Sequence, residues 1–362
     1  MDDAAFMRRA LKLAARGIGN TSPNPLVGAV IARDGVELAS GFHERAGAAH
    51  AEDVALRAAG ENAKGATLYV SLEPCAHQGR TPPCADAIAA SGVARVVIAV
   101  EDPDPNVRGR GIAQLRGVGI DVDVGVAAAP ARELNRAYFH QRATGLPFVT
   151  LKMAQALNGT IGASKNARQQ LTGAAAAKFV RTLRHEHDAV MVGVNTVVVD
   201  DPQLTVRPRK RRHVPYLRVV VDSAGRIPPV SAILSGQSKA QTIVATTERM
   251  PQSVRERLTK KRVEVMVCGA AADGRVDLND LLHRLGSRGV LSVLCEGGPA
   301  LAAALLRAGD VQRLHWLNVP RVIAGPEAVA VLGGAGEPLD LRFRIASVKQ
   351  LGDDVLVTAA LE

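Results

Sequence analysis

The chain has 362 residues, 47% of them hydrophobic and only 3% aromatic, which suits two globular domains with aliphatic cores. No apolar run reaches the ~18 residues of a membrane span, and the acidic start lacks the features of a signal peptide, so we expect neither. The formal net charge of +10 fits either nucleic acid or phosphorylated small molecules as partners. With only four cysteines, the composition favours a reducing, cytoplasmic setting over a disulfide-rich secreted one.

The first part of the chain alternates predicted helices and strands. A helix with one apolar face is expected first, followed by a hairpin around Asp34-Gly35. The expected helices are 2–16, one from Ala51, one from Cys84, 109–116 and 133–143, and the strands are 26–32, 36–42, 68–73, 95–100 and 121–126. This order predicts a three-layer α/β/α sandwich. Gly145 and Pro147 then break the last helix, so we place a domain boundary between residues 1–146 and 147–362.

Four residues of this first domain form a metal-site pattern: His50, Glu52, Cys75 and Cys84. One imidazole and two thiolates are a borderline-soft set suited to Zn²⁺, and three protein ligands leave a fourth position open, as in catalytic sites. Each of the three lies near a predicted helix N-terminus, where free N–H groups favour thiolate. Glu52 is the candidate proton shuttle. The pattern matches that of zinc deaminases, although eight residues instead of two separate the cysteines.

The second part predicts an open, largely parallel α/β sheet, because buried strand-like runs alternate with helices. The expected strands are 148–153, 189–194, 218–221, 242–245, 263–267 and 290–295, and the helices are 174–185, 278–285 and 299–309. No G-x-G-x-x-G follows the first strand, so an ordinary dinucleotide fingerprint is absent. Glu296-Gly297-Gly298, between a strand and a helix, is the best candidate to cradle a phosphate.

Two further features of this part bear on partners and redox state. The densest basic cluster, residues 207–213, contains a proline and no aromatic residue, so it lacks the stacking surface of a single-strand binder. We interpret it as a solvated loop. Cys268 and Cys295 end apolar runs and are expected to be buried free thiols, with a disulfide between them left open. We therefore expect small-molecule partners, and neither nucleic acid nor a membrane.

Several motifs resemble those of the bifunctional riboflavin-biosynthesis deaminase–reductases. In the first domain they are residues 21–28, 41–52 and the whole loop 74–84; in the second they are residues 151–154, 188–196, 200–207 and 218–223, with Glu296-Gly297-Gly298. The resemblance covers nearly the whole chain. It implies a cytidine-deaminase-like first domain and a second domain similar in fold to dihydrofolate reductase. The implied cofactors are one zinc ion per chain and NADPH, and self-association is common in the family.

The resemblance also assigns roles to individual residues. Asn24, held between two prolines, would lie against the pyrimidine of the deaminase substrate together with His43 and His77. In the reductase half, the residues placed at NADPH are Ala154, Thr196, Asp200, Ser223 and Gly298. Those placed at the ribose-phosphate substrate are Lys152, Arg184, Leu204, Arg207 and Glu296.

The implied reactions are hydrolytic deamination of a phosphoribosylated diaminopyrimidine and NADPH-dependent reduction of its ribosyl group to a ribityl chain. Three positions depart from the family: Asn158 replaces an Asp, while Arg168 and Gln170 stand where a Ser and a Trp are usual. They leave open a paralogue whose deaminase works and whose reductase is degenerate or repurposed. A nucleic-acid base deaminase would share the zinc residues without needing the second domain, and a zinc-stabilised RNA-binding module would need neither Glu52 nor an open zinc position.

Overall fold

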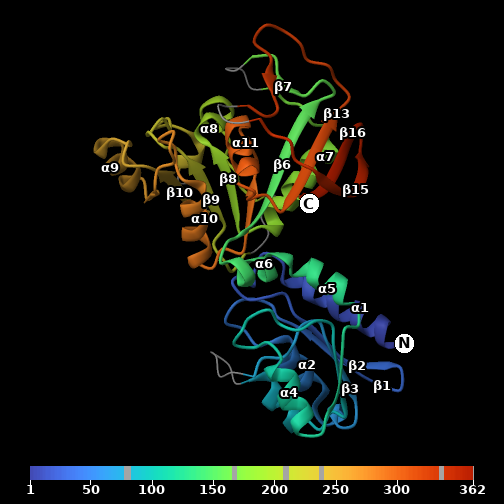
Figure 1. Cartoon of the computed structure of the whole chain (residues 1–362). Helices are drawn as coiled ribbons and strands as arrows, with labels where there is room; N and C mark the ends of the chain where they lie inside the picture. Colours follow the sequence, from blue (N-terminus) through green and yellow to red (C-terminus); the bar gives the residue numbers. More distant parts are fainter. Residues whose placement is uncertain (77–82, 165–168, 207–211, 236–239, 334–337, 362) are drawn as a thin grey trace. The chain divides into compact units, whose positions relative to one another are not determined.

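The computed structural model describes residues 1–76, 83–164, 169–206, 212–235, 240–333 and 338–361, so His77, Arg168 and Arg207 lie outside the described residues (Figure 1). The chain divides into two compact units. Unit 1 comprises Met1–Gly145 with Arg212–Val214, and unit 2 comprises Leu146–Arg211 with Pro215–Glu362. Among the helices described, none has the length and apolar character needed to cross a membrane.

Unit 1 is built on a five-stranded mixed sheet with the order β2-β1-β3-β4-β5. The strands are β1 Gly28–Arg33, β2 Val36–Phe42, β3 Thr67–Val70, β4 Arg95–Ile98 and β5 Asp121–Val124. β1 pairs antiparallel with both β2 and β3, whereas β3, β4 and β5 are parallel. The carboxyl ends of the three parallel strands therefore share one edge of the sheet, and β3 leads from that edge toward Cys75.

Helices cover both faces of this sheet, so the three-layer prediction is confirmed (Figure 1). On one face, Phe6 of α1 (Asp3–Ala14, continued by a 3₁₀ turn at Ala15–Gly17) stacks on Tyr69 with ring centroids 5.0 Å apart. On the other face, the buried side chains of three helices share a core with Leu68, the strand neighbour of Tyr69. These helices are α2 Ala51–Ala59, with a 3₁₀ turn at Gly60–Ala63, α3 Cys84–Ala90 and α4 Arg110–Gly117.

The single helix expected over residues 133–143 is two helices, α5 Ala128–Leu134 and α6 Arg136–Thr144. Asn135 separates them because its backbone leaves the helical region, with φ −99° and ψ +17°. Its side chain bonds a distant part of the backbone. Its Oδ1 accepts from the Leu26 N–H at 2.8 Å, and its Nδ2 donates to the Leu26 carbonyl at 2.9 Å. The two residues lie 109 positions apart in the sequence, so local helix propensity cannot predict their pairing.

Unit 2 contains a nine-stranded sheet with the order β11-β10-β9-β8-β12-β6-β13-β16-β15. The strands are β6 Phe148–Ala156, β8 Ala189–Gly193, β9 Leu217–Val221, β10 Gln241–Thr246, β11 Glu264–Val267, β12 Ser292–Cys295, β13 Arg313–Val319, β15 Phe343–Leu351 and β16 Asp354–Leu361. The seven strands from β11 to β13 are parallel. Six of them were predicted as a largely parallel sheet, whereas β13 was not predicted. The antiparallel β15–β16 hairpin at the other edge was not predicted. β7 Thr160–Gly162 and β14 Val329–Ala330 form a separate small pair.

The helices of unit 2 lie against both faces of its sheet (Figure 1). They are α7 Ala174–Glu186, α8 Val194–Asp200, α9 Gln252–Lys260, α10 Leu278–Ser287 and α11 Pro299–Arg307, with a 3₁₀ turn at Ala232–Leu234. Along β6, Leu151 and Met153 pack with α10 and α11, whereas Ala154 packs with α7. Lys152 therefore shares the α7 face of the strand. Cys268 and Cys295 are buried free thiols, as expected.

Candidate active sites

The start of α2 places His50 and Glu52. His50 is the residue that precedes the helix, and Glu52 is the second residue within it. Strand β2 approaches this helix closely at Gly41, where an added Cβ would lie only 2.5 Å from the Ala51 carbonyl oxygen. A side chain at position 41 would push the helix away. The glycine therefore fixes the distance between the sheet and the two polar residues.

The two cysteines come from neighbouring elements and meet His50. Cys75 follows β3, and Cys84 is the first residue of α3. His50 Nδ1 lies 3.0 Å from Cys84 Sγ and 3.7 Å from Cys75 Sγ, and all three ligand atoms lie within 4.8 Å of one another. A tetrahedral zinc ion with ordinary bond lengths separates its nitrogen and sulfur ligands by roughly 3.5–3.8 Å. The His50–Cys75 distance lies in this range, and the His50–Cys84 distance is shorter by about 0.5 Å. These residues thus fit a zinc ion in chemistry, and a small outward shift of the His50 or Cys84 side chain gives the spacing.

Hydrogen bonds and burial set the charges in this cluster. The hydrogen bond from the Cys84 thiol lowers the pKa of Cys75 to about 4 and raises that of Cys84 itself. The Cys84 N–H also donates to Cys75 Sγ at 3.4 Å. Beside them, burial raises the pKa of Glu52 to about 7; this side chain is only 3% exposed. The cluster thus combines a stabilised thiolate with a secluded carboxyl group that can carry a proton.

Asn24 and His43 lie beside the same cluster. Asn24 Nδ2 and His43 Nε2 are 3.1 Å apart, and His43 Nδ1 is 3.0 Å from the Ala49 carbonyl oxygen. The His43 ring meets the His50 ring edge to face, with centroids 5.4 Å apart. Burial lowers the pKa of His43, which favours the neutral imidazole. The structure therefore brings two of the three predicted pyrimidine contacts to the metal cluster, and the third, His77, lies outside the described residues.

In unit 2, an ion pair between Arg184 of α7 and Glu296 marks the second site. Arg184 Nη2 lies 2.7 Å from Glu296 Oε2, and Nε bonds the other carboxylate oxygen. Arg184 Nη1 also donates to the Thr205 carbonyl oxygen at 3.5 Å. Burial lowers the pKa of Lys152, and the charges of Glu296 and Asp200 oppose that shift. Four residues predicted for the reductase thus lie close enough to act electrostatically on one another.

The turn after β12 has the shape that its glycines predict. Gly297 and Gly298 have φ angles of +101° and +93°, which other residues rarely adopt. An added Cβ on Gly298 would lie 3.3 Å from Thr196 Oγ1, and one on Gly297 would lie 3.2 Å from Met153 Sδ. The turn therefore passes directly beside α8, which carries Thr196 and Asp200. Gly297 is buried, whereas Gly298 is partly exposed and offers its backbone to a ligand.

The other residues predicted for the reductase site that the structure describes pack in the core or bond to the backbone. Leu204 is buried in the core with a φ of +48°. Ala154 packs against the core beside α7. Ser223 Oγ accepts the Val276 N–H at 3.0 Å, which leaves its hydroxyl hydrogen and one lone pair for another partner. Arg207 lies outside the described residues.

Two of the departures from the family have clear local roles. Asn158 Nδ2 donates to the Ile323 carbonyl at 2.7 Å, and its Oδ1 accepts from the Ile323 N–H at 3.2 Å. An Asp carboxylate could make only the second bond, so the amide suits this turn. Gln170 Nε2 donates to the Thr172 carbonyl at 3.2 Å. Arg168 lies outside the described residues.

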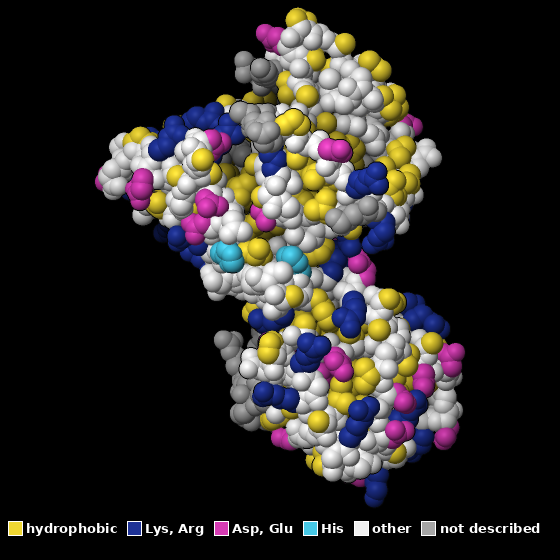
Figure 2. Space-filling view, viewed as in Figure 1, with side chains coloured by type: hydrophobic (Ala, Val, Ile, Leu, Met, Phe, Trp, Pro, Cys, Tyr) yellow, Lys and Arg dark blue, Asp and Glu magenta, His cyan; other side chains and the backbone are white. Residues whose placement is uncertain are grey.

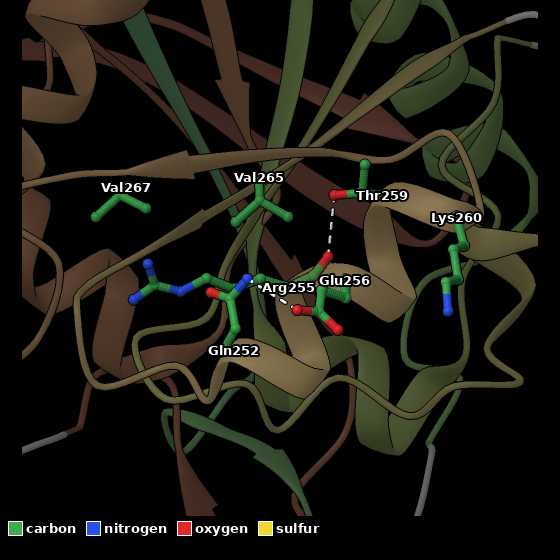
Figure 3. A pocket seen from close by; sticks show the side chains of 7 residues that line it. All are labelled: Gln252, Arg255, Glu256, Thr259, Lys260, Val265 and Val267. Carbon is green, nitrogen blue, oxygen red and sulfur yellow. Dashed lines mark hydrogen bonds between the residues drawn. The ribbon is translucent and has the colours of Figure 1, made fainter.

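A hollow of about 480 Å³ lies elsewhere in unit 2, between α9 and β11 (Figure 3). Its lining residues are Gln252, Arg255, Glu256, Thr259, Lys260, Val265 and Val267. None of them is a predicted site residue. β11 is the edge strand of the sheet, four places from β12 in the strand order, so this hollow is separate from the Glu296 turn.

The fold and the two clusters define a class of protein: a zinc-dependent hydrolytic deaminase joined to a reductase. Residues 1–100 match the family model described as the cytidine and deoxycytidylate deaminase zinc-binding region, and residues 147–357 match the RibD C-terminal domain. The riboflavin biosynthesis protein RibD of Actinobacillus pleuropneumoniae is 39% identical over 361 residues, which cover 99% of this chain and 95% of the relative. The Escherichia coli protein of that name is 39% identical, with 98% of each chain covered.

Solved structures agree along the whole length. Acinetobacter baumannii RibD matches with a TM-score of 0.88 and 36% identity, covering 99% of both chains. A Thermotoga maritima protein, named as a diaminohydroxyphosphoribosylaminopyrimidine deaminase/5-amino-6-(5-phosphoribosylamino)uracil reductase, matches with a TM-score of 0.86 and 31% identity over 99% of both chains. This chain belongs to the RibD family of riboflavin biosynthesis proteins. It is a bifunctional enzyme, with a zinc deaminase domain followed by an NADPH-dependent reductase domain.

Proposed function

We propose that this chain catalyses both of the reactions for which the Thermotoga maritima relative is named. The first is hydrolytic removal of an exocyclic amine from a phosphoribosylated diaminopyrimidine. The second is reduction of the ribosyl group of the deaminated product to a ribityl chain. The observation that carries the proposal is the cluster of His50, Cys75 and Cys84 with the buried carboxyl group of Glu52 beside it.

In the deaminase half, His50, Cys75 and Cys84 would hold the zinc ion. When bound, zinc is a Lewis acid that makes water a competent nucleophile near neutral pH. Glu52 takes a proton from the attacking water and delivers it to the pyrimidine ring. It then takes the remaining proton from the hydroxyl group on the ring carbon and gives it to the amino group, which leaves as ammonia as the carbonyl forms. Its seclusion from solvent keeps that proton within the site. The paired Asn24 and His43 side chains orient the pyrimidine, with the Asn24 amide held by the His43 ring.

In the reductase half, NADPH supplies the hydride. The partly exposed backbone of Gly298, with Thr196 and Asp200 on α8, forms the proposed cofactor contact. Lys152 and Arg184 provide the positive charge for the substrate phosphate. Glu296 fixes the guanidinium of Arg184 in a two-point bond, so that it does not swing away when the substrate leaves.

We also propose the setting in which the enzyme works. The domain boundary lies between residues 1–146 and 147–362, and the enzyme is cytoplasmic, with phosphorylated pyrimidines and not nucleic acid or membranes as partners. On the face of unit 1 in Figure 2, Lys and Arg side chains lie interspersed with Asp and Glu, which suits small-molecule substrates better than a polyanion. Self-association, as a homo-oligomer, follows from the family resemblance, and sedimentation of the purified chain tests it.

The proposal is tested by assaying each half-reaction on the purified chain. We expect ammonia release from the diaminopyrimidine substrate, and NADPH oxidation when the deaminated product is supplied directly. The competing candidate, a paralogue with a repurposed reductase, is favoured by Arg168 and Gln170, since the loss of a Trp removes a large flat surface. If NADPH binds without turnover, and Arg168→Ser with Gln170→Trp restores turnover, the reductase half is degenerate or repurposed.

A further inference from the structure

Glu73, two residues before the zinc-ligand candidate Cys75, is a buried carboxylate that the reactions above do not use. It is only 4% exposed and lies where the chain leaves β3. Its own N–H donates to the Val100 carbonyl at 3.0 Å, which ties its backbone to the chain that continues β4. A buried acid costs free energy unless partners satisfy it. The role of Glu73 therefore depends on what its carboxylate binds.

The carboxylate accepts four backbone N–H bonds from a segment about thirty to forty residues further along the chain. Oε2 accepts from Asp102 at 3.2 Å and from Gly109 at 3.0 Å. Oε1 accepts from Gly111 at 3.1 Å and from Ile112 at 3.3 Å. Three of these N–H groups belong to the N-terminus of α4, where Gly109 precedes the helix and offers no side chain to cap it. Glu73 supplies the missing cap from another element, at the end of the helix that favours negative charge.

The same helix also touches the chain immediately before Cys75. An added Cβ on Gly111 would lie 2.0 Å from the Pro74 carbonyl oxygen, so the first turn of α4 packs directly on that peptide. Beyond it, the Cys75 carbonyl accepts the Ala85 N–H at 3.1 Å. Cys75 is therefore held on one side by α3, which carries the other thiol, and on the other side by α4 through Glu73 and Pro74.

We propose that Glu73 is a positioning residue for the zinc site: its carboxylate clamps the N-terminus of α4 to the strand end that carries Cys75. The inference deepens the proposed deaminase and rests on its zinc ligands. Residues that orient metal ligands without touching the metal are typically worth about 10–100-fold in metal affinity or activity. Glu73 differs from the usual case because it orients a thiolate through the backbone.

The test is the rate at which zinc passes from the protein to a chromogenic chelator, measured well below the melting temperature. Glu73→Gln has the same shape, but its amide nitrogen faces two N–H groups that it cannot accept from. We expect zinc release to be about 10–100-fold faster than in the wild type. We also expect a weaker thiolate-to-metal charge-transfer band when cobalt replaces zinc. Leu115→Ala is the control, because it destabilises the same helix from its fully buried apolar side.

If Glu73→Gln releases zinc no faster than Leu115→Ala, general destabilisation explains the effect and the inference is overturned. A wild-type chain that never binds zinc overturns the proposed deaminase as well, so the two failures are distinguishable.

Hydrogen exchange on the wild-type chain provides a second measurement that needs no variant. Because coupling is reciprocal, removing zinc should accelerate exchange of the Gly109, Gly111 and Ile112 amides. The Ala5 amide is the control: the Asp2 side chain caps it at 2.7 Å within its own helix. Equal protection of the α4 amides with and without zinc would contradict the clamp.

Discussion

Replacing Glu52 by Gln separates the chemistry of the deaminase from its structure. The side chain is 3% exposed and lies in the first turn of α2. Gln fills the same space and leaves His50, Cys75 and Cys84 unchanged, so we expect the variant to fold and to keep its zinc. What it loses is the ability to accept and return a proton.

The size of that loss follows from the role. A positioned acid–base group is typically worth about 10²–10⁴-fold in rate, or about 2.7–5.5 kcal/mol at 1.36 kcal/mol per tenfold. Glu52 is proposed to act twice, on water and on the leaving ammonia, which favours the upper end of that range. The effect should fall on kcat, since the substrate contacts Asn24 and His43 are untouched.

The assay is ammonia release with zinc content measured on the same samples. Asp53→Asn is the matched control: it removes one charge from the same helical turn, where Asp53 makes an exposed pair with Arg57 at 2.7 Å. Its rate should stay within a few-fold of wild type, because exposed pairs contribute little. Near-normal ammonia release by zinc-loaded Glu52→Gln would refute the proton-transfer role.

Three further predictions concern the domains and the reductase. A fragment of residues 1–146 should bind one zinc ion by metal analysis, and a folded fragment without zinc would show that the boundary is wrong. Gly298→Ala, which combines a φ of +93° with a Cβ 3.3 Å from Thr196 Oγ1, should weaken NADPH binding at least tenfold by fluorescence titration; unchanged binding would move the cofactor elsewhere. Glu296→Gln leaves the half-buried Arg184 without its carboxylate. It should lower the free energy of unfolding of unit 2 by about 3 kcal/mol in urea titrations. An unchanged free energy of unfolding would mean that the ion pair does not stabilise the unit.

The sequence predicts six of the seven parallel strands of unit 2, because they read as apolar runs. β13 was not predicted, because polar residues such as His315 and Asn318 interrupt its apolar ones. The edge hairpin is different. β15 carries exposed side chains such as Ile345 and Val348, 61% and 60% exposed, so it shows no apolar run. α8 was missed for the opposite reason: its Val-rich sequence favours a strand. In the structure it is a helix despite that propensity, and it lies beside the Gly298 turn.

The zinc cluster could be predicted because its ligands are chemically distinctive and each stands at the end of an expected element. The structure brings His50, Cys75 and Cys84 together, with Asn24 and His43 beside them. The capping role of Glu73 could not be predicted in this way. Its partners are backbone N–H groups, which no residue type marks, and they become neighbours only when α4 packs against the end of β3.

The central claim is that His50, Cys75 and Cys84 hold the catalytic zinc ion, and metal analysis tests it most directly. The wild-type chain should contain about one equivalent of zinc, and Cys75→Ala should contain almost none, because two protein ligands hold zinc far more weakly than three. The reductase unit provides a check that the variant is folded, since its NADPH oxidation should persist. Full zinc occupancy in folded Cys75→Ala would contradict the assignment.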